Sequence, residues 1–105
     1  MTDWTPEQIA KWHEDTFPNA TMESQLLKLE EEIGEYFSSE DDMEEYADVY
    51  IVVKVLQLRY KSLIGDIMSE LLLNDDDVIR CINNKMDINT QRKWEFVDGV
   101  YRHVE

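Results

Sequence analysis

Two short acidic clusters contain the residues with the clearest potential for chemistry. Glu32 and Glu35 are three residues apart in the first cluster, and Glu45 and Asp48 are three apart in the second. Residues three apart lie on one face of a helix, so each pair can point the same way. If the two segments are neighbouring helices, four carboxylates converge, and a cation is needed to neutralise them. Oxygen ligands of this kind suit Mg²⁺ or Mn²⁺, which indicates phosphate chemistry.

Spacing alone is weak evidence in so acidic a chain. With 24 Asp and Glu among 105 residues, roughly five pairs at this spacing would arise by chance, and a solvated acidic helix face is the alternative. Two features favour a site. Asp48 directly precedes the most apolar segment of the chain, and an unpaired carboxylate next to a buried helix is costly. Gly34 lies inside a helix at a cost of about 1 kcal/mol relative to Ala, which suggests close approach by another backbone or by a substrate.

A second set of residues has the character of a phosphate clamp. Lys85, Asn89 and Arg92 are spaced i, i+4, i+7, which places them on one face if a single helix carries all three. An ammonium, an amide and a guanidinium in one row can bind phosphate oxygens. The alternative is a set of surface salt bridges, which an acidic protein forms in any case.

Aromatic residues near both ends of the chain could stack a nucleobase. They are Trp12, Phe17 and Trp94, and base–aromatic stacking does not depend on the identity of the base. Packing in a core or an interface is the alternative for each of them. His13 could contact a base or a phosphate, or it could be a packed core histidine. Cys81 is interpreted as a small core residue, because no partner for a nucleophile is placed beside it.

Capping signals and periodicity predict an all-α helical bundle of about five helices. A capping box from Thr5 to Gln8 begins the first helix, and Trp4 and Ile9 are spaced as a hydrophobic staple. The stripe that should bury the second helix comprises Met22, Leu26, Leu29, Ile33 and Phe37. The predicted helices are 6–16, 22–37, 40–60, 62–73 and 76–94, followed by an irregular tail over 95–105.

The third predicted helix is ambiguous. Residues 49–55 are rich in β-branched side chains and could form a strand. No Gly or Pro lies between Gly34 and Gly65, and an uninterrupted segment of that length favours a helix. Because this helix is apolar nearly all round, we expect it to be buried.

Composition limits the possible partners. The chain has the length of one domain, and its net charge of −14 argues against nucleic acid and anionic membranes. A nucleotide is still compatible when a cation mediates its binding. The modest core of so small a domain makes dimerisation a natural way to bury more surface. The single Cys81, the lack of a signal peptide in residues 1–6, and an apolar stretch too short to span a bilayer predict a cytoplasmic protein.

The acidic clusters also resemble a family signature. Residues 31–35 (EEIGE), followed by 44–49 (EEYADV), resemble the EExxE and ExxD motifs of the all-α NTP pyrophosphatases, the MazG-like superfamily. The resemblance implies Mg²⁺-dependent hydrolysis of nucleoside triphosphates to monophosphate and pyrophosphate. It implies metal ligation by Glu32, Glu35, Glu45 and Asp48, with Glu31 as a further site carboxylate that positions water. The spacer between the motifs is shorter than usual, so the hairpin between the helices must be tight.

Three further segments resemble the subgroup related to dATP/dGTP pyrophosphohydrolases of bacteria and phages. They are residues 85–94 (KMDINTQRKW), 12–21 (WHEDTFPNAT) and 98–105 (DGVYRHVE). The resemblance implies a single domain over 1–105, with the active site in a four-helix core that is completed in a homodimer or a dimer of dimers. It implies substrate binding by Lys85, Asn89, Arg92, Trp94, Trp12 and His13. The rival hypotheses are a non-catalytic acidic helical interaction module and a different nucleotide target. Residues 62–77 form a longer segment than in close relatives.

Overall fold

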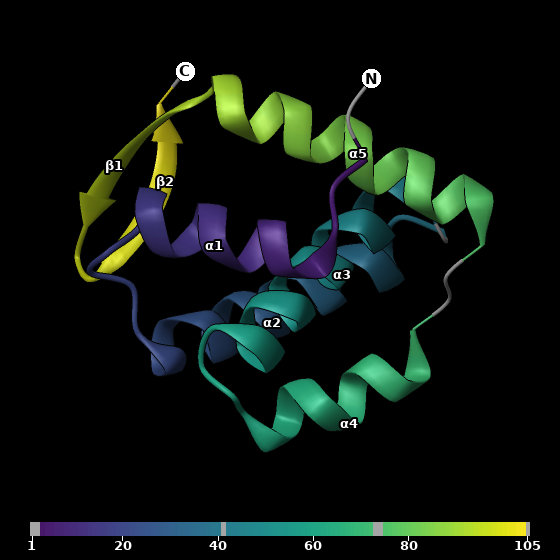
Figure 1. Cartoon of the computed structure of the whole chain (residues 1–105), viewed down its shortest axis with the longest axis horizontal. Helices are drawn as coiled ribbons and strands as arrows, with labels where there is room; N and C mark the ends of the chain where they lie inside the picture. Colours follow the sequence, from purple (N-terminus) through teal and green to yellow (C-terminus); the bar gives the residue numbers. More distant parts are fainter. Residues whose placement is uncertain (1–2, 41, 73–74, 105) are drawn as a thin grey trace.

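The computed structural model describes residues 3–40, 42–72 and 75–104 as five helices and a small antiparallel hairpin (Figure 1). Helix α3 lies at the centre and packs against each of the other four helices. Helices α5 and α4 lie on opposite sides of it, and the hairpin stands beside the C-terminal end of α1 (Figure 1). The elements are α1 (Pro6–Thr16), α2 (Met22–Ser38), α3 (Met43–Leu58), α4 (Leu63–Leu71), α5 (Asp76–Gln91), β1 (Lys93–Val97) and β2 (Val100–Val104).

Local capping sets the starts of the helices. The predicted start of α1 is confirmed, whereas α3 begins at Met43 rather than at residue 40. The hydroxyl of Thr5 accepts a hydrogen bond from the backbone N–H of Gln8 at 3.1 Å, and the Gln8 side chain accepts from the Thr5 N–H at 2.9 Å. This is the predicted capping box, with Pro6 at the first helical position. Asp42 and Asp75 cap α3 and α5 in the same manner, through carboxylate oxygens that accept backbone N–H groups.

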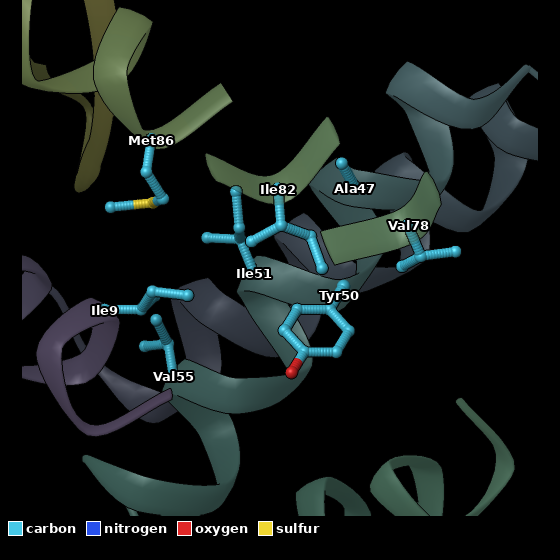
Figure 2. Close-up of a cluster of buried hydrophobic side chains, with 8 residues drawn as sticks. All are labelled: Ile9, Ala47, Tyr50, Ile51, Val55, Val78, Ile82 and Met86. Carbon is cyan, nitrogen blue, oxygen red and sulfur yellow. The ribbon is translucent and has the colours of Figure 1, made fainter. Parts of the chain in front are cut away.

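Helix α3 is a buried helix rather than a strand, which confirms the helical prediction for this segment. One of its sides packs with α1 and α5 in the cluster that Figure 2 shows, where Ile9 and Met86 meet Ile51 and Val55. The other side packs with α2 in a second cluster that contains Leu29, Val49, Val52, Val53 and Leu56. Complete burial of one such side chain stabilises the fold by about 1.5–3 kcal/mol, which outweighs the weak helix propensity of Val and Ile.

Helix α4 approaches α3 at a glycine. A Cβ on Gly65 would lie 2.5 Å from the backbone nitrogen of Gln57, so only glycine permits this contact. Lys54 donates to the Ser69 hydroxyl at 2.7 Å across the same interface. The outward face of α4 is apolar and exposed, with Leu63 and Leu71 each 72% exposed. The homodimer or dimer of dimers stays a prediction with which such a face is compatible, and sedimentation equilibrium would test it.

The C-terminal part of the chain differs from the sequence prediction. Helix α5 ends at Gln91 rather than Trp94, and residues 93–104 form a hairpin rather than an irregular tail. Asp98 and Gly99 both have positive φ, 51° and 81°, as a two-residue hairpin loop of type I′ requires. The alternation of side chains that leads to an Asp–Gly pair was a strand signal, and the prediction of an irregular tail did not use it.

The predicted apolar stripe of α2 is correct only in its middle. Leu29 is buried, and Leu26 and Ile33 pack against the second cluster, but Met22 and Phe37 at the two ends are exposed. The C-terminal end of α2 still contacts α3 through Tyr36, whose ring lies 5.5 Å from that of Tyr46, so Phe37 is on the solvent side of the helix. The predicted helices 40–60 and 62–73 include residues 41 and 73, which, like residue 74, lie outside the described residues. Among the described helices, none combines the length and the apolar character that crossing a membrane requires.

Candidate active site

A cavity of about 520 Å³ lies between α2, α3, α5 and the hairpin, and the end of α1 closes one side of it. Its floor is the apolar surface of α3 at Ile51, Val52 and Val55. All but one of the predicted site residues line this cavity. They are Glu31, Glu32, Glu35, Asp48, Lys85, Asn89, Arg92, Trp94, Trp12 and His13. The exception is Glu45, whose carboxylate lies close to those of Glu32 and Glu35.

Three of the four predicted metal ligands converge. Glu32 and Glu35 of α2 and Glu45 of α3 each offer one carboxylate oxygen within 4.8 Å of the others. The order of the elements makes this possible, because α2 ends at Ser38, α3 begins at Met43, and the two helices pack against each other. Oε2 of Glu32 and Oε2 of Glu45 are buried, and neither has a hydrogen-bond partner among the described residues. A buried carboxylate oxygen without a partner is costly, so these atoms suit a cation.

Burial holds these carboxyl groups toward their protonated forms. Burial raises the pKa of Glu32 to about 7, and Lys28 only partly opposes this rise. Burial also raises the pKa of Glu45, to which Asp48 and Glu35 add as neighbouring carboxylates. The pKa of Asp48 is raised by burial as well, and Lys85 opposes that rise. A bound divalent cation would reverse these shifts, because it favours the ionised carboxylates.

Two lysines pair with the acidic group in the structure. Lys28 lies 3.1 Å from Oε1 of Glu32, one helical turn away. Lys85 of α5 lies 3.4 Å from Oδ2 of Asp48, and both side chains are mostly buried. Asp48 thus connects the acidic side of the cavity to the basic side. The role of Lys28 was missed from the sequence, although its i, i+4 spacing to Glu32 was a usable signal.

The predicted phosphate clamp faces the carboxylates. Lys85 and Asn89 lie on α5, one turn apart, and both line the cavity. Arg92 also lines the cavity, but it is the C-cap of α5 and has an extended backbone, with ψ of 152°. The prediction that one helix carries all three residues is therefore wrong at Arg92. The three side chains nevertheless reach the same cavity.

The balance of charge in the cavity differs from that of the whole chain. Acidic residues outnumber basic ones 24 to 10 overall, whereas four of each line the cavity. The basic ones are Lys28, Lys85, Arg92 and Arg102. A cavity with a carboxylate cluster on one side and several cations on the other can hold a polyanion together with a metal ion.

An aromatic cluster centred on Phe17 forms the other end of the cavity. The ring of Phe17 lies 5.2 Å from Trp12, 5.0 Å from Trp94 and 4.7 Å from Tyr101, measured between centroids. Phe17 is buried, and the indole N–H of Trp94 donates to the carbonyl of Asn89 at 3.2 Å. These rings therefore contribute to packing, and at the same time they provide a planar wall against which a base can stack.

The hairpin supplies residues that sequence reasoning did not assign. Val100, Tyr101, Arg102 and His103 of β2 line the cavity. The Tyr101 hydroxyl accepts a hydrogen bond from the backbone N–H of Asn19 at 3.3 Å, which ties the hairpin to the segment after α1. The C-terminal strand is therefore a wall of the site rather than a loose tail.

Two expectations for the carboxylate helix have different outcomes. Glu31 lines the cavity beside Glu32, as a further site carboxylate should. Gly34, in contrast, is exposed, and no atom of a described residue outside its own helix and chain neighbours lies within 4 Å of the position that its Cβ would occupy. Gly34 therefore does not mark the close approach of another part of the described chain.

The site combines a mostly all-α domain, a carboxylate cluster and the facing cations Lys85 and Arg92, a combination that suits a phosphate-bearing ligand together with a metal ion. The dATP/dGTP pyrophosphohydrolase family model matches residues 5–103, so the chain belongs to this family. A curated relative, the dATP/dGTP diphosphohydrolase of Salmonella phage PMBT28, is 35% identical over 98 residues. That match covers 91% of this chain but only 29% of the relative. No solved structure matches the chain significantly.

Proposed function

We propose that this protein is a Mg²⁺-dependent pyrophosphohydrolase of purine deoxynucleoside triphosphates. It would cleave dATP and dGTP to the monophosphate and pyrophosphate. The observation that carries the proposal is the convergence of Glu32, Glu35 and Glu45 within 4.8 Å on one side of a cavity that Lys85 and Arg92 line from α5 and its C-cap. Membership of the family supports the reaction and the purine substrates.

The donor set fits a hard divalent cation. Glu32, Glu35, Glu45 and Asp48 would hold Mg²⁺, or Mn²⁺, through carboxylate oxygens. The two buried oxygens without partners, on Glu32 and Glu45, are the atoms for which a cation is most needed. When bound, the metal would polarise phosphoryl oxygens and lower the pKa of a ligated water.

The residues of the chain would divide the remaining work. Glu31 would orient the attacking water and accept its proton as the water oxygen bonds to the α-phosphorus. The bond from the α-phosphorus to the bridging oxygen breaks, and pyrophosphate leaves with that oxygen. Lys85, Asn89 and Arg92 would hold the phosphate oxygens and offset the charge that develops on them. The base would lie at the aromatic end, near Trp12, Trp94 and His13.

The direct test is hydrolysis of a panel of dNTPs and NTPs with Mg²⁺, in which released pyrophosphate is measured. We expect dATP and dGTP to be cleaved and the activity to be lost in EDTA. Glu32→Ala and Asp48→Asn should each abolish it. Absence of turnover with every nucleotide would refute the enzyme hypothesis in favour of a non-catalytic helical module. Full activity in both variants would refute the ligand assignment.

A further inference from the structure

Arg59, at the C-terminal end of α3, contacts the end of α1 through a single nitrogen. Its Nη1 lies 2.8 Å from Nδ1 of His13, 3.0 Å from the carbonyl oxygen of Phe17 and 3.3 Å from that of His13. A guanidinium has only donors and stays protonated in proteins. Nδ1 of His13 must therefore be the acceptor, because a proton on Nδ1 would face an N–H group.

This contact determines the state of the imidazole. With Nδ1 as acceptor, the neutral ring carries its proton on Nε2. Burial lowers the pKa of His13 to about 3, and the Arg59 charge adds to this effect, so the ring is neutral at physiological pH. No described residue hydrogen-bonds to Nε2. Because His13 lines the cavity, Nε2–H is the donor left for a ligand.

The position of His13 fits the base rather than the phosphates. Arg59 follows Asp48 by eleven residues along α3, a rise of about 16 Å along the helix axis. His13 therefore lies at the end of the cavity away from the carboxylates, and its ring packs at 4.8 Å against Phe17 of the aromatic cluster. The Nε2–H group of His13 is therefore placed to donate to an acceptor on the base of a nucleotide.

Adenine and guanine share one acceptor on their major-groove edge, the edge that carries N7 and position 6. Both carry N7, whereas position 6 is a donor in adenine and an acceptor in guanine. A donor with a fixed tautomer that faces this edge can therefore serve both purines only through N7, which pyrimidines do not have.

We propose that Arg59 is a positioning residue that locks His13 in the neutral Nε2–H tautomer, so that His13 donates to N7 of the purine. This inference rests on the proposed function for its substrate. Its part concerning Arg59 can be tested without turnover.

The first test is nitrogen-15 NMR of the two imidazoles in the free protein, with His103→Asn used to assign the signals. We expect His13 to carry its proton on Nε2 and to stay neutral from pH 5 to pH 8. In Arg59→Gln the pKa of His13 should rise but stay below 6.5, because burial persists, and both tautomers should appear. Arg80→Gln is the matched control, because Arg80 is an exposed arginine outside the cavity. It should change neither the pKa nor the tautomer of His13. A proton on Nδ1 in the native protein would overturn the proposal.

The second test compares kcat/KM for dATP and 7-deaza-dATP, in which a C–H replaces N7. The native protein should lose about tenfold with the analogue, the effect of one hydrogen bond. His13→Phe, which keeps a ring but no donor, should show no such difference, whereas His13→Gln, which keeps a donor, should retain part of it. Arg59→Gln should reduce the difference, whereas Arg59→Lys, which keeps a cationic donor for Nδ1, should retain it.

An equal loss with 7-deaza-dATP in the native protein and in His13→Phe would overturn the N7 contact. Failure to cleave any triphosphate would overturn the proposed function and the N7 contact with it. The imidazole spectra would still decide the role of Arg59.

Discussion

Replacement of Glu32 by Gln should stabilise the metal-free protein while it abolishes activity. Glu32 is 6% exposed, and its Oε2 has no partner. The folded state therefore prefers the neutral carboxyl group, and Gln is a neutral side chain of nearly the same shape. The loss of the Lys28–Glu32 ion pair, with Lys28 38% exposed, should subtract at most about 1 kcal/mol.

The size of the effect follows from the pKa of Glu32. Its value rises from 4.5 to about 7 on folding, and one pKa unit corresponds to about 1.4 kcal/mol. Ionised Glu32 therefore destabilises the folded state by about 3 kcal/mol at pH 8. Between pH 4.5 and pH 7 the folded state binds more protons than the unfolded state, so stability falls as pH rises through this window. Below the window the cost is absent, and above it the cost is complete.

Urea denaturation in EDTA at pH 5 and pH 8 measures this effect. The native protein should be more stable at pH 5, and Glu32→Gln should lose about 2.5 kcal/mol of that difference, because a small part of the cost is already present at pH 5. Glu30→Gln is the matched control, because it removes the same charge from an exposed position on α2 and should keep the native pH dependence. If Glu32→Gln also kept the native pH dependence of stability, the carboxyl group of Glu32 would not be the source of that dependence, and the reasoning would be refuted. Mg²⁺ at 100 times its Kd should stabilise the native protein by about 2.7 kcal/mol, and Glu32→Gln much less.

Two other predictions test the site and the fold separately. Lys85→Met removes the cation that pairs with Asp48 at 3.4 Å, and we expect kcat/KM for dATP to fall by about 100-fold or more; an unchanged value would exclude Lys85 from substrate binding. Gly65→Ala should destabilise the protein by about 1–3 kcal/mol in urea denaturation, because its Cβ would meet the backbone of Gln57. Gly34→Ala should instead stabilise it by up to about 1 kcal/mol. A destabilised Gly34→Ala would contradict the open surroundings of Gly34, and a stabilised Gly65→Ala would contradict the contact at Gly65.

The parts of the fold that local chemistry determines were predictable from the sequence. Capping residues at Thr5, Asp42 and Asp75 begin three helices where the sequence placed their starts, to within a few residues. The i, i+3 spacing of Glu32 and Glu35 correctly predicted that they share a side of α2. Such features depend on neighbours within one or two helical turns, and those neighbours are visible in the sequence.

The features that were missed depend on contacts between distant segments. Arg59 and His13 are 46 residues apart, and no spacing rule connects a C-cap residue of one helix with the end of another. The exposure of Phe37 depends on which side of the last turn of α2 faces α3, which periodicity alone does not specify. The hairpin is a different case, because Asp98-Gly99 was a local hairpin signal, and the error lay in interpreting residues 95–105 as an irregular tail and in ending the helix at Trp94 rather than Gln91.

Local and distant pairings together explain how the fold tolerates its acidic cluster without a metal ion. Lys28 is a local partner, one turn from Glu32 on the same helix, and this ion pair can form wherever α2 forms. Lys85 is a distant partner that reaches Asp48 only when α5 packs on α3. These lysines pair with one oxygen each and leave Oε2 of Glu32 and of Glu45 without a partner. The same arrangement that lets the free protein fold thus keeps oxygens available for a cation, and it places Lys85 beside the phosphates that such a cation would bind.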